Sequence, residues 1–335
     1  MRGPRSGHIA LVILGIVAGL LGRAETAQAN GCDSTVPITH TTIQAAVDAA
    51  PNPGPWKICV NDGTYVESVK ILGRNTAAVD ATETIRVVAV NPRGAIVNPG
   101  GLPNPARYHA FSVATSNFIS IEGFKLTGAT REAVFIRGGL SMTNRNISVI
   151  ATEITGNGSP STNGGIFIGR ENPDTLVDGN TIHRNFRNAL EIEGDIYKNP
   201  TNSPKVITNN LICKNGWSGV YSGRTFTDVI TLLDNDIHCN GTATGSTGGR
   251  FGVFRQAVAP KSGAGFRQNI ILDGNEICSN TGGDIANVNQ TLGPLVNDTG
   301  NVTTLGNEEA QCLAPGCAGA ITGTCLVTDC DVLCP

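Results

Sequence analysis

The stretch Asn180-Thr-Ile182-His-Arg-Asn185 returns three more times further along the chain. The other copies are Asn210-Leu-Ile212-Cys-Lys-Asn215, Asn235-Asp-Ile237-His-Cys-Asn240 and Asn275-Glu-Ile277-Cys-Ser-Asn280. From the last asparagine of one copy to that of the next, the steps are 30, 25 and 40 residues. A helical repeat would lose its packing register over such unequal steps, whereas short strands joined by loops absorb insertions. The repeat therefore predicts a solenoid built from strands.

The segments between the repeats are short, β-branched and bounded by Gly or Asn, as in Thr175–Asp178, Val206–Thr208 and Ile230–Leu233, which is typical of strands. Each coil then reads as three strands and three turns, and parallel coils would stack about 4.8 Å apart. Stacking predicts two asparagine ladders that exchange amide hydrogen bonds between coils, and one inward isoleucine column. These columns are Asn180, Asn210, Asn235 and Asn275; Asn185, Asn215, Asn240 and Asn280; and Ile182, Ile212, Ile237 and Ile277.

The segments 42–51 and 60–69 resemble a capping helix followed by a first strand. Together with the repeats they resemble right-handed parallel β-helices of the pectin-lyase-like superfamily, over residues 38–300. The resemblance implies an all-β fold, a right-handed parallel β-helix of about eight coils. It also implies a short N-terminal capping helix and a Cys-rich C-terminal cap.

No specific enzyme family of this superfamily matches. Gly63–Glu67 resembles a segment of pectin methylesterases, yet their Gln-Asp and Asp-Phe-Ile-Phe-Gly catalytic stretches have no counterpart here. The Asn-Thr-Asp-Gly and Gly-His-Gly motifs of polygalacturonases and the Asp-Pro-His-Asp motif of mannuronan epimerases are also missing. The resemblance thus indicates a fold and leaves the activity open.

Residues 1–29 resemble a secretory signal peptide, with an apolar stretch, Ile9–Gly22, too short for a membrane span. We therefore expect no membrane span and a secreted protein, extracellular, periplasmic or on the cell surface. The remaining expected parts are an N-terminal cap with the first strand (30–80), the β-helix (81–304) and a Cys-rich disulfide tail or cap (305–335). Capping at both ends predicts a monomer. The formal net charge of −3, without a basic run, argues against nucleic acid as a partner.

Ten cysteines in an exported chain favour disulfides over a metal site. We expect Cys32 and Cys59 to pin the N-terminal cap, and Cys213 and Cys239 to bridge adjacent coils. Cys278 competes for Cys239. The alternative is a His/Cys metal site in the column of His183, Cys213, His238 and Cys278. Residues two coils apart in that column would be about 9.6 Å from each other, which disfavours a shared ion.

The strand after each polar turn presents a second set of columns. These strands are 133–137, 165–169, 189–193, 219–223 and 252–256. Period-two alternation points Val134, Ile166, Leu190, Val220 and Val253 inward, and Phe135, Phe167, Glu191, Tyr221 and Phe254 outward. Arg137, Glu193 and Gln256 form the next outward column, and Arg170, Asp195 and Arg224 follow at the turn.

A row of outward aromatics suits the apolar faces of sugar rings, with polar groups reading the hydroxyls. The expected substrate-binding residues are Phe135, Arg137, Phe167, Tyr221 and Phe254. The alternative is that the long neighbouring loops cover these rings as a small second core, with ordinary ion pairs beside them.

Two chemistries fit the expected catalytic residues Glu191, Glu193, Arg170 and Arg224. Glu191 and Glu193 lie about 6.6 Å apart along one strand, which suits the two carboxyls of a glycoside hydrolase. A uronate lyase would instead hold Ca²⁺ with Glu191, Glu193 and Asp195 and use Arg170 or Arg224 as base or carboxylate clamp. Nothing in the sequence requires a cofactor, and Ca²⁺ is the one candidate.

The sequence therefore predicts a secreted β-helix protein that acts on or binds an extracellular polysaccharide. As an enzyme it would be a uronate-polysaccharide lyase or a glycoside hydrolase. The alternative is a non-catalytic carbohydrate-binding or structural cell-surface protein.

Overall fold

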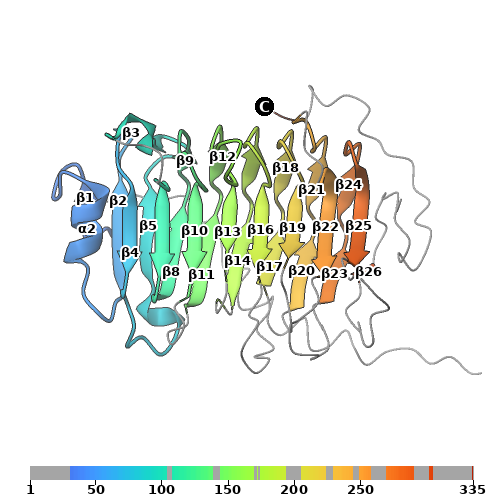
Figure 1. Ribbon diagram of the computed structural model, residues 1–335. Coiled ribbons are helices and arrows are strands. Elements are labelled where there is room, and N and C mark those ends of the chain that lie inside the picture. Colours follow the sequence, from blue (N-terminus) through green and yellow to red (C-terminus); the bar gives the residue numbers. More distant parts are fainter. Residues whose placement is uncertain are drawn as a thin grey trace, which may run out of the picture.

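The computed structural model describes residues 31–103, 108–138, 144–169, 172, 174–193, 205–223, 229–243, 249–257, 269–289, 302–304 and 334. Within these residues the chain winds through coils that stack side by side along one axis (Figure 1). The expected signal peptide, nearly all of the Cys-rich tail, and the candidate residues Arg170, Asp195 and Arg224 lie outside the described residues.

Three parallel sheets, named A, B and C, form the walls of the solenoid. Sheet A contains β1 (Ser34–Val36), β2 (Trp56–Val60), β5 (Ile85–Ala89), β8 (Asn117–Glu122), β11 (Arg145–Ile150), β14 (Thr175–Asp178), β17 (Lys205–Thr208), β20 (Val229–Leu233), β23 (Asn269–Asp273) and β26 (Val302–Thr304). Sheet B contains β3 (Gly63–Tyr65), β6 (Ala95–Val97), β9 (Lys125–Leu126), β12 (Glu153–Thr155), β15 (Thr181–His183), β18 (Leu211–Cys213), β21 (Asp236–His238) and β24 (Glu276–Cys278). Sheet C contains β4 (Val69–Leu72), β7 (Phe111–Ala114), β10 (Val134–Arg137), β13 (Ile166–Ile168), β16 (Leu190–Glu193), β19 (Val220–Gly223), β22 (Phe251–Ala257) and β25 (Gly283–Asn289).

The expected capping helix is confirmed as α2 (Ile43–Ala49) at the N-terminal end of the stack (Figure 1). The Thr42 hydroxyl accepts from the Ala45 N–H, and the Glu67 carboxylate accepts from the N–H groups of Ile43 and Gln44. Both contacts satisfy donors that a helix start leaves open. Strand β1 precedes the helix and was not predicted. Two short 3₁₀ helices, η1 (Ala81–Glu83) and η2 (Pro99–Gly101), lie in turns. Among the described residues, no helix is long and apolar enough to cross a membrane.

The predicted inward columns form the core. Ile182 pairs in register with Ile212, Ile212 with Ile237, and Ile237 with Ile277, and all four side chains are fully buried. The inward column of sheet C is also confirmed. It consists of Val134, Ile166, Leu190, Val220 and Val253, each at most 1% exposed. Branched side chains stacked in register pack these two columns of the interior closely.

Both asparagine ladders are confirmed. The Asn215 side-chain oxygen accepts from the backbone N–H and the amide of Asn185, each at 3.1 Å. Its own amide donates to the Ile182 carbonyl and to the Asn240 side chain, each at 3.0 Å. Asn210 bonds in the same way to the coils on either side. Asn210 and Asn215 therefore each fasten three consecutive coils.

The turn from sheet B to sheet C, which we call the B–C corner, begins with a residue in the left-handed conformation. In two early coils this residue is glycine, Gly128 with φ 70° and Gly156 with φ 66°. In later coils it is Arg184, Lys214, Cys239 and Ser279, with φ between 51° and 57°. Because a side chain at such a φ is disfavoured, these positions hold non-glycine residues at an energetic cost.

The disulfides confirm one expected pair and correct the other. Cys32 bonds to Cys59, as predicted. The predicted Cys213–Cys239 pair is wrong, because Cys213 bonds to Cys334, 121 residues away. Cys213 pairs in register with His238 rather than with Cys239, which begins the B–C corner. Cys239 and Cys278 each take part in a disulfide as well. The thiols of the alternative His/Cys metal column are therefore consumed, in agreement with the expected preference for disulfides.

The ladder predicts the effect of Asn215→Ala. The variant leaves the buried N–H of Asn185 and the carbonyl of Ile182 without their side-chain partners, and each such loss costs about 1–3 kcal/mol. We expect the free energy of unfolding, measured by urea denaturation, to fall by about 3 kcal/mol or more. Asn91→Ala, in an exposed turn, is the control and should change it by less than about 0.5 kcal/mol. Equal effects would refute the ladder.

Candidate functional site

The outer face of sheet C brings the predicted column together. Register pairs Phe135 with Phe167, Phe167 with Glu191, Glu191 with Tyr221, and Tyr221 with Phe254. Glu193 pairs with Gly223, and Gly223 pairs with Gln256. The predicted order of side chains along this face is therefore confirmed. Their role in binding a substrate stays a prediction.

The rings on this face stack on one another. Phe135 lies between His109, at 4.6 Å and 20° between planes, and Phe167, at 5.0 Å and 11°. Phe254 stacks on Phe251 at 5.2 Å and 14°, contacts Tyr221 at 5.6 Å, and is only 7% exposed. Both faces of Phe135 are covered, so this ring presents an edge outward rather than an open face. The column is a packed ladder of rings, which the sequence pattern alone did not show.

Glu191 interrupts this ladder between Phe167 and Tyr221 and is half-buried. Burial raises the pKa of its carboxyl to about 7, and the nearby carboxylates of Glu193 and Glu132 act in the same direction. Asn188 opposes them by donating from its amide to Glu191 Oε2 at 3.2 Å. A carboxyl with a pKa near neutrality can both give and take a proton at neutral pH.

A chain of polar side chains runs beside Glu191 across neighbouring coils. The Asn188 amide also donates to Asn163 Oδ1 at 3.3 Å. Asn163 contacts Glu132, whose pKa is raised because its carboxyl is buried. Glu132 Oε2 is buried without a hydrogen-bond partner. Two carboxyls with raised pKa values therefore share one edge of the face.

His109 ends this chain. Its Nδ1 lies 3.0 Å from the Glu132 carbonyl oxygen, to which it donates, and 3.3 Å from Glu132 Oε2. Burial lowers the pKa of His109 to about 4, so the ring is neutral at pH 7 and its Nε2 is an acceptor. Sequence reasoning missed both His109 and Glu132. They lie just before their strands, where period-two alternation gives no direction for a side chain.

The predicted Ca²⁺ ligands are only partly within the described residues. Glu191 and Glu193 supply two carboxylates, and Asn188 donates to one oxygen of Glu191. Ca²⁺ takes six to eight oxygen ligands. Among the described residues no group of three or more His, Cys, Asp or Glu is arranged to hold a metal ion, and Asp195 lies outside them. These residues alone do not fit Ca²⁺, and the calcium site stays a prediction.

Arg137 is the remaining predicted residue within the described part of this face. It is exposed at the end of β10, and its Cγ lies 3.4 Å from the point where a Cβ would stand on Gly169. The missing side chain at Gly169 thus leaves room for the Arg137 stem to lie along the face.

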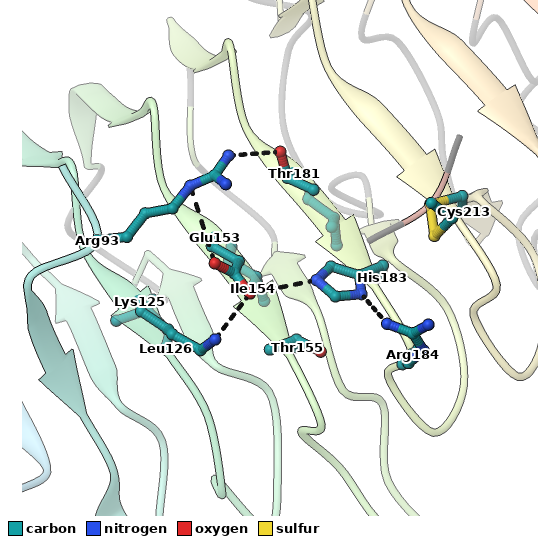
Figure 2. A network of polar contacts seen from close by, with 12 residues as sticks. Arg93, Lys125, Leu126, Glu153, Ile154, Thr155, Thr181, His183, Arg184 and Cys213 are labelled. Atoms are coloured by element: carbon teal, nitrogen blue, oxygen red, sulfur yellow. Dashed lines mark hydrogen bonds and ion pairs between the residues drawn. A yellow bond between two sulfur atoms is a disulfide. The ribbon is translucent and has the colours of Figure 1, made fainter. Parts of the chain in front are cut away.

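A second polar cluster lies on the outer face of sheet B (Figure 2). Glu153 Oε1 lies 3.0 Å from Lys125 Nζ and 3.4 Å from His183 Nε2, and Glu153 Oε2 lies 3.8 Å from Arg93 Nε. Burial alone would raise the pKa of Glu153, but Lys125, His183 and Arg93 outweigh it and hold the pKa below its usual value. Arg184 Nη1 donates to His183 Nδ1 at 3.3 Å, which leaves the ring proton on Nε2, facing Glu153.

The two carboxylates differ in what they can do. Glu153 is held ionised by surrounding cations, so it serves as a fixed charge that ties coils together. Glu191 is desolvated by rings and faces other carboxyls, so its proton is exchangeable near pH 7. Acid–base chemistry therefore favours the outer face of sheet C as the candidate site.

The pKa of Glu191 predicts how stability depends on pH. In the unfolded chain the carboxyl would titrate near its ordinary value of 4.5, against about 7 in the folded protein. The wild type should therefore lose up to about 3 kcal/mol as pH rises through this window, because 1 pKa unit corresponds to about 1.4 kcal/mol.

The matching experiment is urea denaturation of Glu191→Gln and the wild type at pH 4.5 and pH 8.5. The variant should gain on the wild type at the higher pH, since it has no proton to lose. The control Glu122→Gln, in an ion pair with Arg86 on sheet A, should show no such gain. A Glu191→Gln difference that is equal at both pH values would contradict the burial of an exchangeable proton.

Comparisons with known proteins address the fold. Residues 105–255 match the family model described as right handed beta helix region. A search of curated proteins found no match. Among solved structures, a periplasmic alginate epimerase, AlgG, is similar at 14% identity and TM-score 0.44, over 75% of this chain and 59% of its own length. Pectate lyase Pel9A is similar at 15% identity and TM-score 0.42, over 83% of this chain and 76% of its own.

A pectin methylesterase from carrot is similar at 11% identity and TM-score 0.47, over 88% of both chains. At such low identity we draw no function from these similarities. The predicted fold is confirmed by the family match and the three parallel sheets. The chain folds as a right-handed parallel β-helix.

Proposed function

We propose that the protein is a glycoside hydrolase that binds a polysaccharide along the outer face of sheet C, with Glu191 as the general acid. The observation that carries this proposal is the carboxyl of Glu191, whose pKa is raised to about 7 in the middle of a solvent-facing column. A general acid works best when its pKa lies near the operating pH.

The shape of the face supports an extended ligand. The column passes through successive coils of a solenoid, and solenoids use such long surfaces for extended partners. Ring edges from Phe135, Phe167 and Tyr221 offer apolar contact, since all three are half-buried rather than covered. Asn163 and Arg137 supply amide and guanidinium donors for hydroxyl groups beside Glu191.

The chemistry uses two carboxyls on one strand. Protonated Glu191 gives its proton to the glycosidic oxygen as the bond to the leaving sugar breaks. Glu193, two residues along β16 on the same face, acts as the second carboxylate. It either attacks the anomeric carbon, forming a glycosyl-enzyme that water then hydrolyses with Glu191 as the base, or removes a proton from the water that attacks directly. Two carboxyl groups about 5–5.5 Å apart retain the configuration at the anomeric carbon, and two about 6.5–9.5 Å apart invert it. The anomer released therefore identifies which role Glu193 has.

We also propose that the protein acts outside the cytoplasm. The disulfide Cys32–Cys59 and the long-range disulfide Cys213–Cys334 support this location, because such bonds persist in oxidising compartments.

A test of the function uses Glu191→Gln and Glu193→Gln in the mature chain, assayed on acidic and neutral polysaccharides with and without EDTA. We expect new reducing ends that EDTA does not abolish, and a turnover at least about 100-fold lower in Glu191→Gln, as for loss of a general acid. Glu122→Gln should retain full turnover. Unsaturated products lost with EDTA would replace this proposal with a Ca²⁺-dependent lyase, and retention on a glycan without cleavage would leave a binding protein.

The ring ladder predicts a change in the pH profile. Phe167→Ala removes the ring on one side of Glu191 and admits water, so the pKa of Glu191 should fall from about 7 toward its ordinary value of 4.5. The high-pH limit of activity should then move to lower pH, because the acid loses its proton earlier. Phe186→Ala, an exposed ring at the B–C corner, should leave the profile unchanged. An unshifted profile in Phe167→Ala would refute the role of the ladder.

A further inference from the structure

The B–C corner carries a concentration of basic side chains on a protein of net charge −3. Arg184 and Lys214 open this turn in consecutive coils, both in the left-handed conformation. Arg187 and Arg250 lie in the same turns, before β16 and β22. Glycine fills the equivalent position in the coils of Gly128 and Gly156. The coils of Arg184 and Lys214 thus place long cationic side chains at a backbone position where glycine would avoid the strain of a positive φ.

Arg184 and Lys214 meet in a surface pocket of about 400 Å³. The described residues that line it are Arg184, Lys214, Cys239, Thr242, Ser279 and Thr281. Its size falls within the usual range of ligand pockets. The lining combines two cations with three hydroxyls and includes no carboxylate among these described residues. Asp236 and Glu276 lie on the same side of the molecule, in β21 and β24, and do not line the pocket.

Neighbouring side chains contact Arg184 and hold it in place beside the pocket. Arg184 donates one guanidinium nitrogen to His183 Nδ1, and His183 in turn contacts Glu153 (Figure 2). The adjoining turns carry two aromatic rings. Phe186 is 51% exposed, and the guanidinium of Arg187 lies 4.0 Å from the centre of the Trp217 ring. Rings beside cations and hydroxyls are groups that contact a sugar bearing a negative charge.

We propose that this corner pocket binds an oxyanion, the carboxylate or sulfate group of an acidic sugar, through Arg184 and Lys214. The hydroxyl of Thr281 donates to an oxygen that the cations leave open. Arginine and lysine are the side chains that pair best with such oxyanions. The site lies in the turn that precedes sheet C and shares no residue with the Glu191 face, so it stands whether or not that face is catalytic.

The experiment measures binding to the full mature chain by calorimetry and by tryptophan fluorescence. The probes are a heparin tetrasaccharide, which carries sulfates and carboxylates, the neutral maltotetraose, and inorganic sulfate as competitor. The site variant is Arg184→Gln with Lys214→Gln. The control, Lys70→Gln with Arg86→Gln, removes two cations from β4 and β5 near the other end of the solenoid. Lys214→Gln alone replaces the double variant if thermal unfolding shows that the latter does not fold.

We expect the wild type to bind the tetrasaccharide, sulfate to compete, and the site variant to bind at least ten-fold more weakly, with the control within two-fold. The chain has two tryptophans, and one of them, Trp217, lies in the same turn as Lys214, so Trp217→Phe should remove most of the fluorescence response. Binding that survives in the site variant would overturn the proposal, as would no binding by the wild type. Binding of sulfate without the tetrasaccharide, or equal binding of maltotetraose, would overturn the assignment to an acidic sugar.

Discussion

The exchange of side-chain amide hydrogen bonds between coils is the constraint on which the rest of the structure depends. Asn185, Asn215 and Asn240 are buried and each one bonds to the next coil through both its backbone N–H and its side chain. A coil shifted by one residue would leave these amides buried without partners, at about 1–3 kcal/mol for each group. Loops of unequal length therefore change the outline of a coil and leave its register unchanged.

Fixed register decides which unlike side chains become neighbours on the outside. Glu153 and Glu191 are both acidic residues on outer faces, and both are partly or largely buried. Glu153 lies in register with Lys125 and receives two further donors, so its charge is stabilised. Glu191 lies in register with Phe167 and Tyr221, so its charge is opposed. The column position of a carboxyl, more than its residue type, sets whether it is a fixed charge or an acid.

The regular part of this arrangement could be predicted because alternation along a strand and stacking between coils are both periodic. That logic placed Phe135, Phe167 and Glu191 in one column. It could not place His109 or Glu132, which precede their strands and take their directions from local turn geometry. Nor could it pair Cys213 with Cys334, since a chain end 121 residues away has no period.

The period-two pattern also predicts which way a side chain points, but it does not predict which groups surround that side chain. The second inward column of sheet C is aliphatic at Ile136, Ile168 and Ile192, then continues with Ser222 and with Arg255, which is 1% exposed. An inward position does not by itself mean an apolar one. In the same way, an outward row of aromatics predicted open ring faces, whereas the coil spacing of about 4.8 Å lets neighbouring rings stack on each other. Rings so placed desolvate an acid between them, and this desolvation is the basis for assigning chemistry to Glu191.

The B–C corner belongs to the same repeat as the strands, but its residues are held under a looser constraint. Turns tolerate insertion and need a left-handed residue, which glycine supplies most easily. Where Arg184 and Lys214 take that position, the backbone points two cations outward at coil spacing, and hydroxyls from later coils complete the pocket. Strand columns thus bring apolar and acidic groups together under strict register, while the corners assemble basic groups under looser constraint. A single solenoid can therefore hold a desolvated acid on one wall and an oxyanion pocket on the adjoining edge, because different elements of the coil build each one.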